Sequence, residues 1–312
     1  MYSVVIPVYK NEGSIPLLVE ALGWLSNQLS NPLEVVFVVD GSPDASLALL
    51  REHLGDNPFV SRVIALSRNF GAFQAIRVGL EHATGRFIGV MAADLQEPVS
   101  LMQEFFRVLE SENYDLAFGK REGRDDPLLS RLSSDCFWFF YRKLIVQDVP
   151  RGGVDVFAVT ARVRDVLVGF KEHRTSLLAL LFWIGFKRTF VPYRRQTRQH
   201  GRSGWTFRKK WNYMLDSIYS FSDLPIRLLG VVGLLGISCS AVMALIALTG
   251  KVFGAIPVPG YATTVIVFSF FGGLNSLGIS TLGAYVWRSF ENTKGRPNSI
   301  IMEIIDFSGT RE

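Results

Sequence analysis

Two long apolar runs without charge place the strongest limit on how this chain can fold. Leu228–Thr249 and Tyr261–Trp287 contain no Asp, Glu, Lys or Arg. Each run is longer than the ~20 residues that an α-helix needs to cross the hydrocarbon layer of a bilayer. The sequence therefore predicts a transmembrane hairpin at 223–288, with spans at about 228–250 and 261–287. A hairpin buried inside a globular core is the alternative.

The distribution of charge predicts how such a hairpin is oriented. Nine Lys or Arg and no acidic residue lie between Lys187 and Lys210, shortly before the first apolar run. Basic residues beside a membrane helix are typical of its cytoplasmic side and attract anionic lipids. Arg227 precedes the first run and Arg288 follows the second, so both ends of the hairpin are expected in the cytoplasm. Nucleic-acid binding is the competing interpretation of the basic run, and the neighbouring apolar segments argue against it.

The expected location is therefore the inner (cytoplasmic) membrane, with a multi-pass topology. The chain begins directly with a strand-like pattern, and no basic region followed by an apolar signal segment precedes it. We accordingly expect a cytoplasmic domain at 1–222 and a cytoplasmic tail at 289–312.

Short runs rich in β-branched and aromatic residues alternate with helical patterns in the first half of the chain. Strands that alternate with helices predict an α/β fold with a mostly parallel sheet and helices on both faces. Ligands of such sheets bind at the carboxyl ends of the strands. The expected strands are Ser3–Tyr9, Glu34–Val39, Val60–Leu66, Arg86–Met91 and Tyr114–Gly119.

Acidic residues follow two of these strands directly. Asp40 ends the second run, and Asp94 follows the fourth. A single Asp at the end of a strand often caps a helix. Two of them on separate strands favour a shared ligand site at one edge of the sheet.

Aromatic and basic residues follow the fifth strand. The pattern predicts amphipathic helices at about 128–146 and 205–221, within the cytoplasmic domain. The first helix either lies in the membrane interface, where aromatic and basic side chains are favoured, or belongs to the core. The second leads into the predicted membrane hairpin.

The motifs along the chain resemble those of a known family. "SVVIPVYKNEGSI", "VVDGSPD", "LSRNFGAFQAI" and "MAADLQEP" are similar to successive signatures of family-two glycosyltransferases with the GT-A (Rossmann-like) fold. "GVDVF", "RQHGRSGW", "DLPIRLL" and the apolar hairpin resemble the polyprenyl-phosphate glycosyltransferases in particular. That group includes dolichol-phosphate mannose synthases and the bacterial enzymes that load glucose or aminoarabinose onto undecaprenyl phosphate. The resemblance runs from Ser3 to about Pro297.

This resemblance implies a reaction and its partners. An oxygen of undecaprenyl phosphate, or of another polyprenyl phosphate, attacks the anomeric carbon of a nucleotide-diphosphate sugar with inversion, and the nucleoside diphosphate leaves. A UDP-sugar is the expected donor. Glucose is the default sugar, and mannose, aminoarabinose or another modified sugar are alternatives. The leaving diphosphate requires charge neutralisation, for which the resemblance implies Mg²⁺ or Mn²⁺ held by oxygen ligands.

The resemblance also implies the residues of the donor side. Asp94 and Gln96 match the metal-binding positions, and Asp94 is thereby also expected to be catalytic. The residues expected to contact the donor nucleotide are Pro7, Tyr9, Glu12, Asp40 and Arg68.

On the acceptor side, Asp155 matches the acidic position usually assigned to catalysis. A phosphate monoester has a second pKa of about 6 and is then largely dianionic, so Asp155 either acts as a base or positions a substrate. Guanidinium groups bind phosphate by two-pronged hydrogen bonding. The segment around Arg198 and Ser203 either orders over the donor or anchors lipid. The candidates for acceptor phosphate binding are Arg121, Arg124, Arg131, Arg198 and Ser203, and an ordinary solvated surface is the alternative for the first three.

The chain departs from the family pattern at two positions. Ala92 stands where the family usually has the first acid of Asp-Ala-Asp-Leu-Gln, and Val39 stands where a second acid usually precedes Asp40. Two alternatives stand beside an active transferase that makes a lipid-linked sugar. One is a degenerate homologue that binds nucleotide sugar or lipid without turnover. The other is a processive polysaccharide synthase, for which the expected Gln-x-x-Arg-Trp segment and further spans are missing.

Gly230, Gly233 and Gly236 can permit close helix packing and hence a homo-oligomer.

Overall fold

The structure is a computed structural model, and residue contacts divide it into two units. Unit 1 comprises Met1–Tyr213 and Arg296–Glu312, and unit 2 comprises Met214–Gly295. The structure describes residues 1–122, 138–139, 141–143, 146, 148–150, 153–154, 156–170, 172, 176–196, 207–252 and 260–309.

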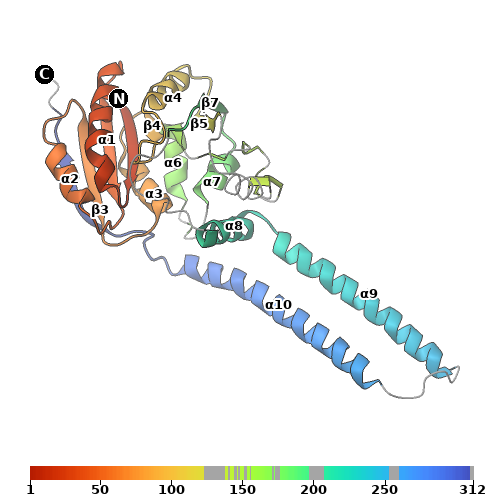
Figure 1. Ribbon diagram of the computed structural model, residues 1–312. Coiled ribbons are helices and arrows are strands. Elements are labelled where there is room, and N and C mark those ends of the chain that lie inside the picture. The colour runs from red at the N-terminus through yellow and green to blue at the C-terminus, as the bar shows by residue number, and fades with distance from the viewer. Residues whose placement is uncertain are drawn as a thin grey trace. The chain divides into compact units, whose positions relative to one another are not determined.

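The described elements follow an α/β order through unit 1 and end with three helices and a strand (Figure 1). The strands are β1 (Tyr2–Val8), β2 (Leu33–Val39), β3 (Val60–Leu66), β4 (Phe87–Val90), β5 (Leu116–Arg121), β6 (Phe157–Thr160), β7 (Arg188–Tyr193) and β8 (Ile301–Phe307). The helices are a 3-10 turn (Glu12–Ser14), α1 (Ile15–Gln28), α2 (Ser46–His53), α3 (Ala72–His82), α4 (Ser100–Glu110), α6 (Ala161–Gly169), α7 (Leu177–Trp183), α8 (Phe207–Phe221), α9 (Leu224–Val252) and α10 (Tyr261–Thr293).

The strands form one mixed sheet in the order β7-β5-β6-β4-β1-β2-β3-β8. The pairs β1–β2, β1–β4, β2–β3 and β5–β7 are parallel, whereas β6 and β8 pair antiparallel with their neighbours. All five strands expected from the sequence are present, with ends that differ by at most two residues. The prediction of an α/β sheet of the GT-A type is therefore confirmed.

Helices cover both faces of the sheet because successive strand residues point to opposite sides. Val4, Ile6 and Val8 of β1 belong to a core that also holds the buried side of α1. On the other face, a Cβ added to Gly79 of α3 would lie 2.2 Å from a methyl carbon of Val5. Close approach of α3 to the sheet therefore depends on glycine at position 79.

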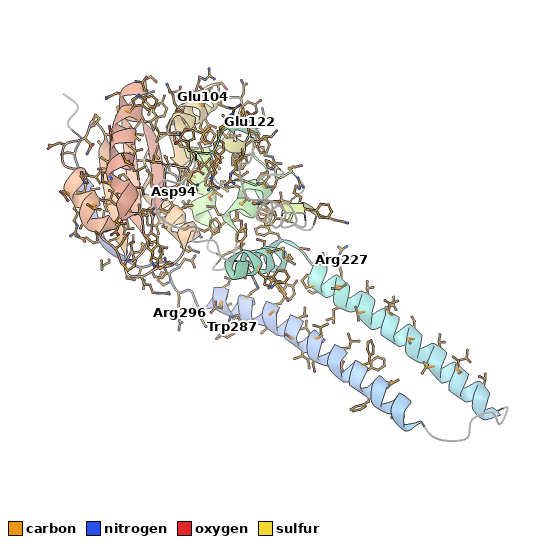
Figure 2. The ribbon with its side chains drawn as sticks, in the orientation of Figure 1. Asp94, Glu104, Glu122, Arg227, Trp287 and Arg296 are labelled. Atoms are coloured by element: carbon orange, nitrogen blue, oxygen red, sulfur yellow. The ribbon has the colours of Figure 1, made fainter. Side chains whose placement is uncertain are left out.

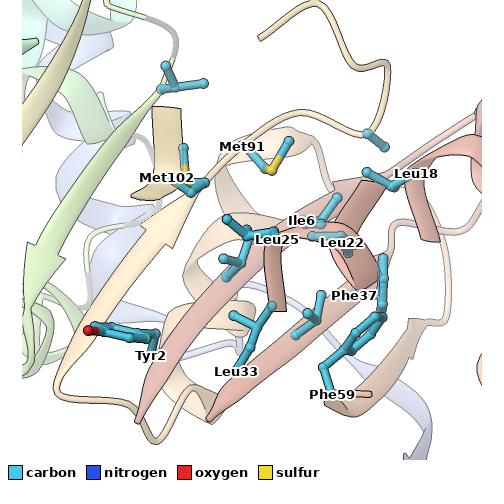
Figure 3. Close-up of a cluster of buried hydrophobic side chains, with 14 of the residues drawn as sticks. Tyr2, Ile6, Leu18, Leu22, Leu25, Leu33, Phe37, Phe59, Met91 and Met102 are labelled. Carbon is cyan, nitrogen blue, oxygen red and sulfur yellow. The ribbon is translucent and has the colours of Figure 1, made fainter. Parts of the chain in front are cut away.

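The core between α1, α4 and the sheet is built from aliphatic and aromatic side chains (Figure 3). Leu18, Leu22 and Leu25 recur on one side of α1, and none of them is exposed to solvent. Phe37 from β2 and Met102 from α4 fill the space beside them. Full burial of each such side chain contributes about 1.5–3 kcal/mol, so this layer holds the strand ends in fixed relative positions.

The C-terminal segment adds a strand that the sequence patterns did not predict. β8 pairs antiparallel with β3 at the edge of the sheet, and Figure 1 shows it in blue at this edge. Asp306 of β8 accepts a hydrogen bond from Arg62 Nε at 2.6 Å, and Glu303 pairs with Arg51. The region 289–312, expected only as a tail, thus contains a strand whose partner lies far away in sequence.

Unit 2 contains two long helices that lie side by side. α9 and α10 contact each other, and Figure 1 shows them running in opposite directions. Arg288 Nη2 of α10 donates to Asp216 Oδ1 at 2.6 Å. Among the residues that the structure describes, Leu224–Met243 is the one stretch long and apolar enough to cross a membrane. The predicted second span, within α10, stays a prediction.

The two amphipathic helices expected from the sequence differ in how far the structure describes them. α8 covers most of the segment expected at 205–221. The segment at about 128–146 lies largely outside the described residues, although 138–139 and 141–143 are helical. Binding of either helix to a membrane interface stays a prediction.

Candidate active site

The loops that follow β1 and β2 are joined by reciprocal hydrogen bonds. Glu12 N–H donates to Asp44 Oδ2 at 3.1 Å, and Glu12 Oε2 accepts from Ala45 N–H at 3.0 Å. Lys10 N–H donates to Ser42 Oγ at 2.8 Å. Glu12, expected to contact the nucleotide, therefore also fixes the position of the second loop.

Asp44 is a residue of this edge that the sequence patterns did not single out. Burial alone would raise the pKa of Asp44, but hydrogen bonds from Ser42, Ser46 and the Glu12 N–H together lower it below the ordinary value. The carboxylate is consequently charged at neutral pH. The available signal was its place in the turn "DGSPD", where Asp commonly accepts hydrogen bonds from nearby backbone.

Asp40 lies at the end of β2 and is buried. Its two carboxylate oxygens accept hydrogen bonds from Phe70 N–H at 2.7 Å and Gly71 N–H at 2.8 Å. Burial raises the pKa of the Asp40 carboxyl, and these two bonds and the charge of Arg68 offset the rise only in part. Asp40 thus holds the segment that leads into α3. Its contact with a nucleotide stays a prediction.

The loop after β3 packs directly on the loop after β2. Gly41 has a φ of +55°, and a Cβ there would lie 2.3 Å from the carbonyl carbon of Arg68. Arg68 itself is exposed, with its guanidinium 4.3 Å from the centre of the Phe70 ring. The structure therefore brings Glu12, Asp40 and Arg68 to one edge of the sheet.

Pro7 and Tyr9 frame the start of the same edge. Pro7 pairs with Val38 of β2 and lies beyond the last pair between β1 and β4, which joins Val5 to Val90. Because proline has no N–H, Pro7 cannot donate a backbone hydrogen bond, and at this position none is lost between β1 and β4. Tyr9 is exposed directly after β1, and its N–H donates to Asn11 Oδ1 at 3.0 Å. Both lie where a ligand at the strand ends can reach them.

Asp94 and Gln96 occupy a tight turn after β4, and Asp94 is labelled in Figure 2. Gln96 N–H donates to Asp94 Oδ1 at 3.3 Å, and Leu95 between them has a φ of +54°. The left-handed conformation of a leucine is strained, which is typical of sites where side chains must point in a required direction. Ala92 and Ala93 precede this turn, so it contains one carboxylate where the related motif has two.

A segment after β7 packs against this turn. Arg195 Nη2 donates to Gln96 Oε1, and Gln196 N–H donates to the Gln96 carbonyl at 2.8 Å. Arg195 Nε lies 3.8 Å from Glu97 Oε1. Neither Glu97 nor Arg195 was expected from the sequence, because Glu97 follows a motif already assigned and Arg195 is one of many arginines in the basic run.

Glu97 is 2% exposed and faces several charged groups. Burial raises the pKa of its carboxyl, the charge of Asp94 raises it further, and Arg195 and Arg121 offset this only in part. Burial, followed by the Glu97 charge, also raises the pKa of Tyr193. A buried acid, two arginines and a tyrosine thus border the turn of Asp94.

Arg121 is the acceptor-side candidate that the structure describes. It lies at the end of β5, and its Nε donates to Tyr193 Oη at 3.3 Å. It is half-buried, and its positive charge acts to lower the pKa of the Glu97 carboxyl, which burial raises. Arg124, Arg131, Asp155, Arg198 and Ser203 lie outside the described residues.

The side-chain oxygen atoms of the turn after β4 fit a divalent metal whose remaining coordination positions are filled by a substrate. Among the described residues, no three His, Cys, Asp or Glu side chains gather closely enough to hold an ion on their own. Asp94 offers a carboxylate and Gln96 an amide oxygen, both of which suit Mg²⁺ and Mn²⁺. Mg²⁺ commonly takes one or two protein carboxylates and fills its other positions with phosphate and water.

Comparison with known proteins assigns the family. Residues 3–168 match the model described as "Glycosyl transferase family 2". This protein belongs to glycosyltransferase family 2. Over 303 residues it is 31% identical to the putative glycosyltransferase CsbB of Bacillus subtilis (strain 168), which covers 97% of this chain and 92% of that protein.

Other relatives of this glycosyltransferase are named by an acceptor. It is 28% identical over 303 residues to the prophage bactoprenol glucosyl transferase homolog of Escherichia coli (strain K12), covering 97% of this chain and 98% of that one. Identity to the bactoprenol glucosyl transferase of Shigella phage SfX is also 28%, over 96% of this chain and 98% of the relative.

Among solved structures, the glycosyltransferase is similar to the glucosyl-3-phosphoglycerate synthase of Mycobacterium tuberculosis in complex with Mn²⁺ and UDP-glucose. The identity is 15% and the TM-score 0.45, over 65% of this chain and 72% of that one.

Proposed function

We propose that this family-two glycosyltransferase transfers a sugar, with glucose as the expected one, from a UDP-sugar to undecaprenyl phosphate or another polyprenyl phosphate. The observation that carries the proposal is the match, over nearly the whole chain, to relatives named bactoprenol glucosyl transferases. The grouping of Glu12, Asp40 and Arg68 at the carboxyl ends of the strands supports it, because ligands of α/β sheets bind there.

The nucleotide is bound by the three interlocked loops after β1, β2 and β3. Glu12 and Asp44 fix the first loop to the second, and Asp40 fixes the third. Pro7, Tyr9 and Arg68 border the resulting surface. Loops that are ordered before the ligand arrives bind it with a smaller loss of conformational entropy, which favours donor affinity.

In the transfer, an oxygen of the lipid phosphate forms a bond to the anomeric carbon while the bond from that carbon to the diphosphate breaks. The electron pair of the broken bond leaves with the nucleoside diphosphate, and the configuration inverts. The acceptor phosphate is bound by Arg121 together with Arg124, Arg131, Arg198 and Ser203. Because that phosphate is largely dianionic above its second pKa of about 6, Asp155 positions a substrate rather than removing a proton.

Asp94 and Gln96 hold Mg²⁺ or Mn²⁺, which supplies positive charge to the leaving diphosphate when bound. Asp94 is the one acid of this pair, and Ala92 stands where the family motif usually has a further acid. The resulting shortage of negative charge predicts that the metal alone binds more weakly than the metal together with a diphosphate.

The long helices of unit 2 anchor the enzyme in the membrane. Leu234 and Leu235 of α9 are 65% and 64% exposed, and Phe268 of α10 is 80% exposed. Apolar side chains this exposed along a helix require a partner, and lipid is the one that fits helices of this length. Figure 2 shows Arg227 and Trp287 at the same end of the helix pair, where basic and aromatic residues favour the interface. That end is expected to face the cytoplasm.

A degenerate homologue that binds nucleotide sugar without turnover is the second candidate, and the alanine at position 92 favours it. Both candidates bind a UDP-sugar, but only the enzyme forms a lipid-linked product. Comparing binding with transfer in one preparation therefore separates them.

The role of Asp94 tests the proposal at the level of a single side chain. We expect Asp94→Asn to lower transfer from UDP-glucose to undecaprenyl phosphate by about 100-fold, because charge at the leaving group is no longer stabilised. Glu104→Gln is the matched control, since Glu104 is exposed on α4 and pairs with Arg107. Equal transfer by Asp94→Asn and the wild-type protein would reject the metal role of Asp94.

A further inference from the structure

The guanidinium of Arg195 is divided between two acceptors of the turn after β4. Nη2 donates to Gln96 Oε1, whereas Nε lies 3.8 Å from Glu97 Oε1, which is too long for a hydrogen bond. Nε and Nη2 form one edge of the guanidinium, and such an edge fits the two oxygens of a single carboxylate. Arg195 therefore makes one hydrogen bond to the amide and no two-pronged pair with the carboxylate.

Glu97 has an unused acceptor that complements this arrangement. The residue is 2% exposed, and its Oε2 has no hydrogen-bond partner among the residues that the structure describes. A buried carboxylate oxygen without a partner is unfavourable. A second bond from Arg195 would satisfy it without burying any further group.

Gln96 Oε1 is the amide oxygen assigned to the metal. A guanidinium that donates to this oxygen lies beside the position that a divalent cation would take, and the two positive charges repel each other. Strong metal binding at Gln96 therefore requires Arg195 Nη2 to move to another acceptor.

Resting on the proposed metal-dependent transfer, we propose that Glu97 is a positioning residue that draws Arg195 away from Gln96 when the metal binds. Nη2 moves from Gln96 Oε1 to Glu97 Oε2, and Nε closes on Glu97 Oε1, so that the pair becomes bidentate. The backbone bond from Gln196 N–H to the Gln96 carbonyl, 2.8 Å long, holds the two segments together, so only side chains move. Glu97 does not touch the metal.

A double-mutant cycle on metal affinity tests this role. The full-length protein in detergent is titrated with Mn²⁺ alone, and free Mn²⁺ is measured by electron paramagnetic resonance. We expect Glu97→Gln to weaken Mn²⁺ binding about tenfold, because Arg195 then keeps its bond to Gln96. Arg195→Gln removes the competing cation and is expected to bind Mn²⁺ at least as tightly as the wild-type protein.

The double variant decides between an indirect and a direct effect. If Glu97 acts through Arg195, then Glu97→Gln has no effect in the Arg195→Gln background. An equal loss of affinity in both backgrounds would show that Glu97 acts as a ligand or by its charge alone, and would overturn the proposal. Glutamine matches glutamate in size and, in place of Arg195, is shorter but uncharged, and Glu104→Gln controls for loss of a nearby surface charge.

The same titration separates this inference from the proposed function. Wild-type protein that binds Mn²⁺, with unchanged affinity in Glu97→Gln, overturns the inference alone. Wild-type protein that binds no Mn²⁺, either alone or in the presence of UDP, overturns both the inference and the metal dependence.

Discussion

Glu12 and Asp44 hold the first two strand-end loops together in both directions. The Glu12 N–H donates to Asp44, while the Glu12 carboxylate accepts from the residue after Asp44. The two acids lie 32 positions apart in sequence, on loops that follow neighbouring parallel strands. The surface proposed to bind the nucleotide is therefore one connected structure rather than separate loops.

Replacement of Asp44 should consequently weaken donor binding without touching the metal side. Asp44→Asn puts an amide N–H₂ where one charged acceptor oxygen was, and a hydrogen bond to a charged group contributes about 1.5–3 kcal/mol. We expect the Kd for UDP, measured by titration calorimetry, to rise about tenfold or more. Asp56→Asn, in the exposed turn before β3, is the control. Unchanged UDP affinity in Asp44→Asn would contradict the coupling of the two loops.

Gly41 should be the least replaceable glycine of this edge. Gly41→Ala brings a Cβ to within 2.3 Å of the Arg68 backbone and also requires a left-handed conformation at φ +55°. Such strain destabilises by about 1–3 kcal/mol. We expect the apparent Tm, measured by monitoring tryptophan fluorescence during heating, to drop by several degrees. Gly55→Ala meets no atom within 4 Å and should keep the wild-type Tm. Equal values for the two variants would show that the loops adjust freely.

The raised pKa of Asp40 predicts a specific pH dependence of stability. A carboxyl with a higher pKa in the folded than in the unfolded state contributes stability that is complete below the unfolded pKa, about 3.8 for Asp. That contribution is lost as the pH rises through the folded pKa.

Asp40→Asn removes this titration and one of the two acceptor oxygens. We expect the variant to be less stable than the wild-type protein, with the difference in unfolding free energy largest at acidic pH and smaller near pH 7. Thermal unfolding of both proteins across this range measures the difference. A gap that widens with increasing pH would show that the Asp40 pKa is lowered instead.

The exposed side of α9 should determine membrane insertion. A positive charge at the centre of a transmembrane helix is unfavourable by about 2.5–3.5 kcal/mol. Leu234→Arg is therefore expected to lower the fraction that resists extraction from membranes at alkaline pH. Val60→Arg changes an exposed apolar residue of β3 in unit 1 and should leave that fraction unchanged. Equal extraction of both variants would contradict the membrane assignment of α9.

The parts of the fold that could be predicted from sequence are those with a local signal. The strands from β1 to β5 follow directly from short β-branched runs, and the positions of Asp40 and Asp94 follow from the ends of those runs. β8 was missed because its partner, β3, lies more than 200 residues away, and pairing over such a distance leaves no local pattern.

The same reason explains which site residues were missed. Asp44 and Glu97 acquire their roles from groups on other loops, Glu12 for the first and Arg195 for the second. For Asp40, the sequence left helix capping and ligand binding open. The structure shows that its carboxylate accepts hydrogen bonds from Phe70 N–H and Gly71 N–H, just before α3, a contact between separate segments that no single-segment motif contains.

The central claim is transfer of a sugar to a polyprenyl phosphate, and its most direct test is detection of the lipid product. The full-length protein in detergent is incubated with undecaprenyl phosphate, Mn²⁺ and each of several nucleotide sugars, and the organic phase is analysed by mass spectrometry. We predict undecaprenyl-phosphate hexose with UDP-glucose, and its loss when Mn²⁺ is chelated. No glycosylated lipid with any donor, while a related glycosyltransferase forms its product in parallel, would contradict the claim.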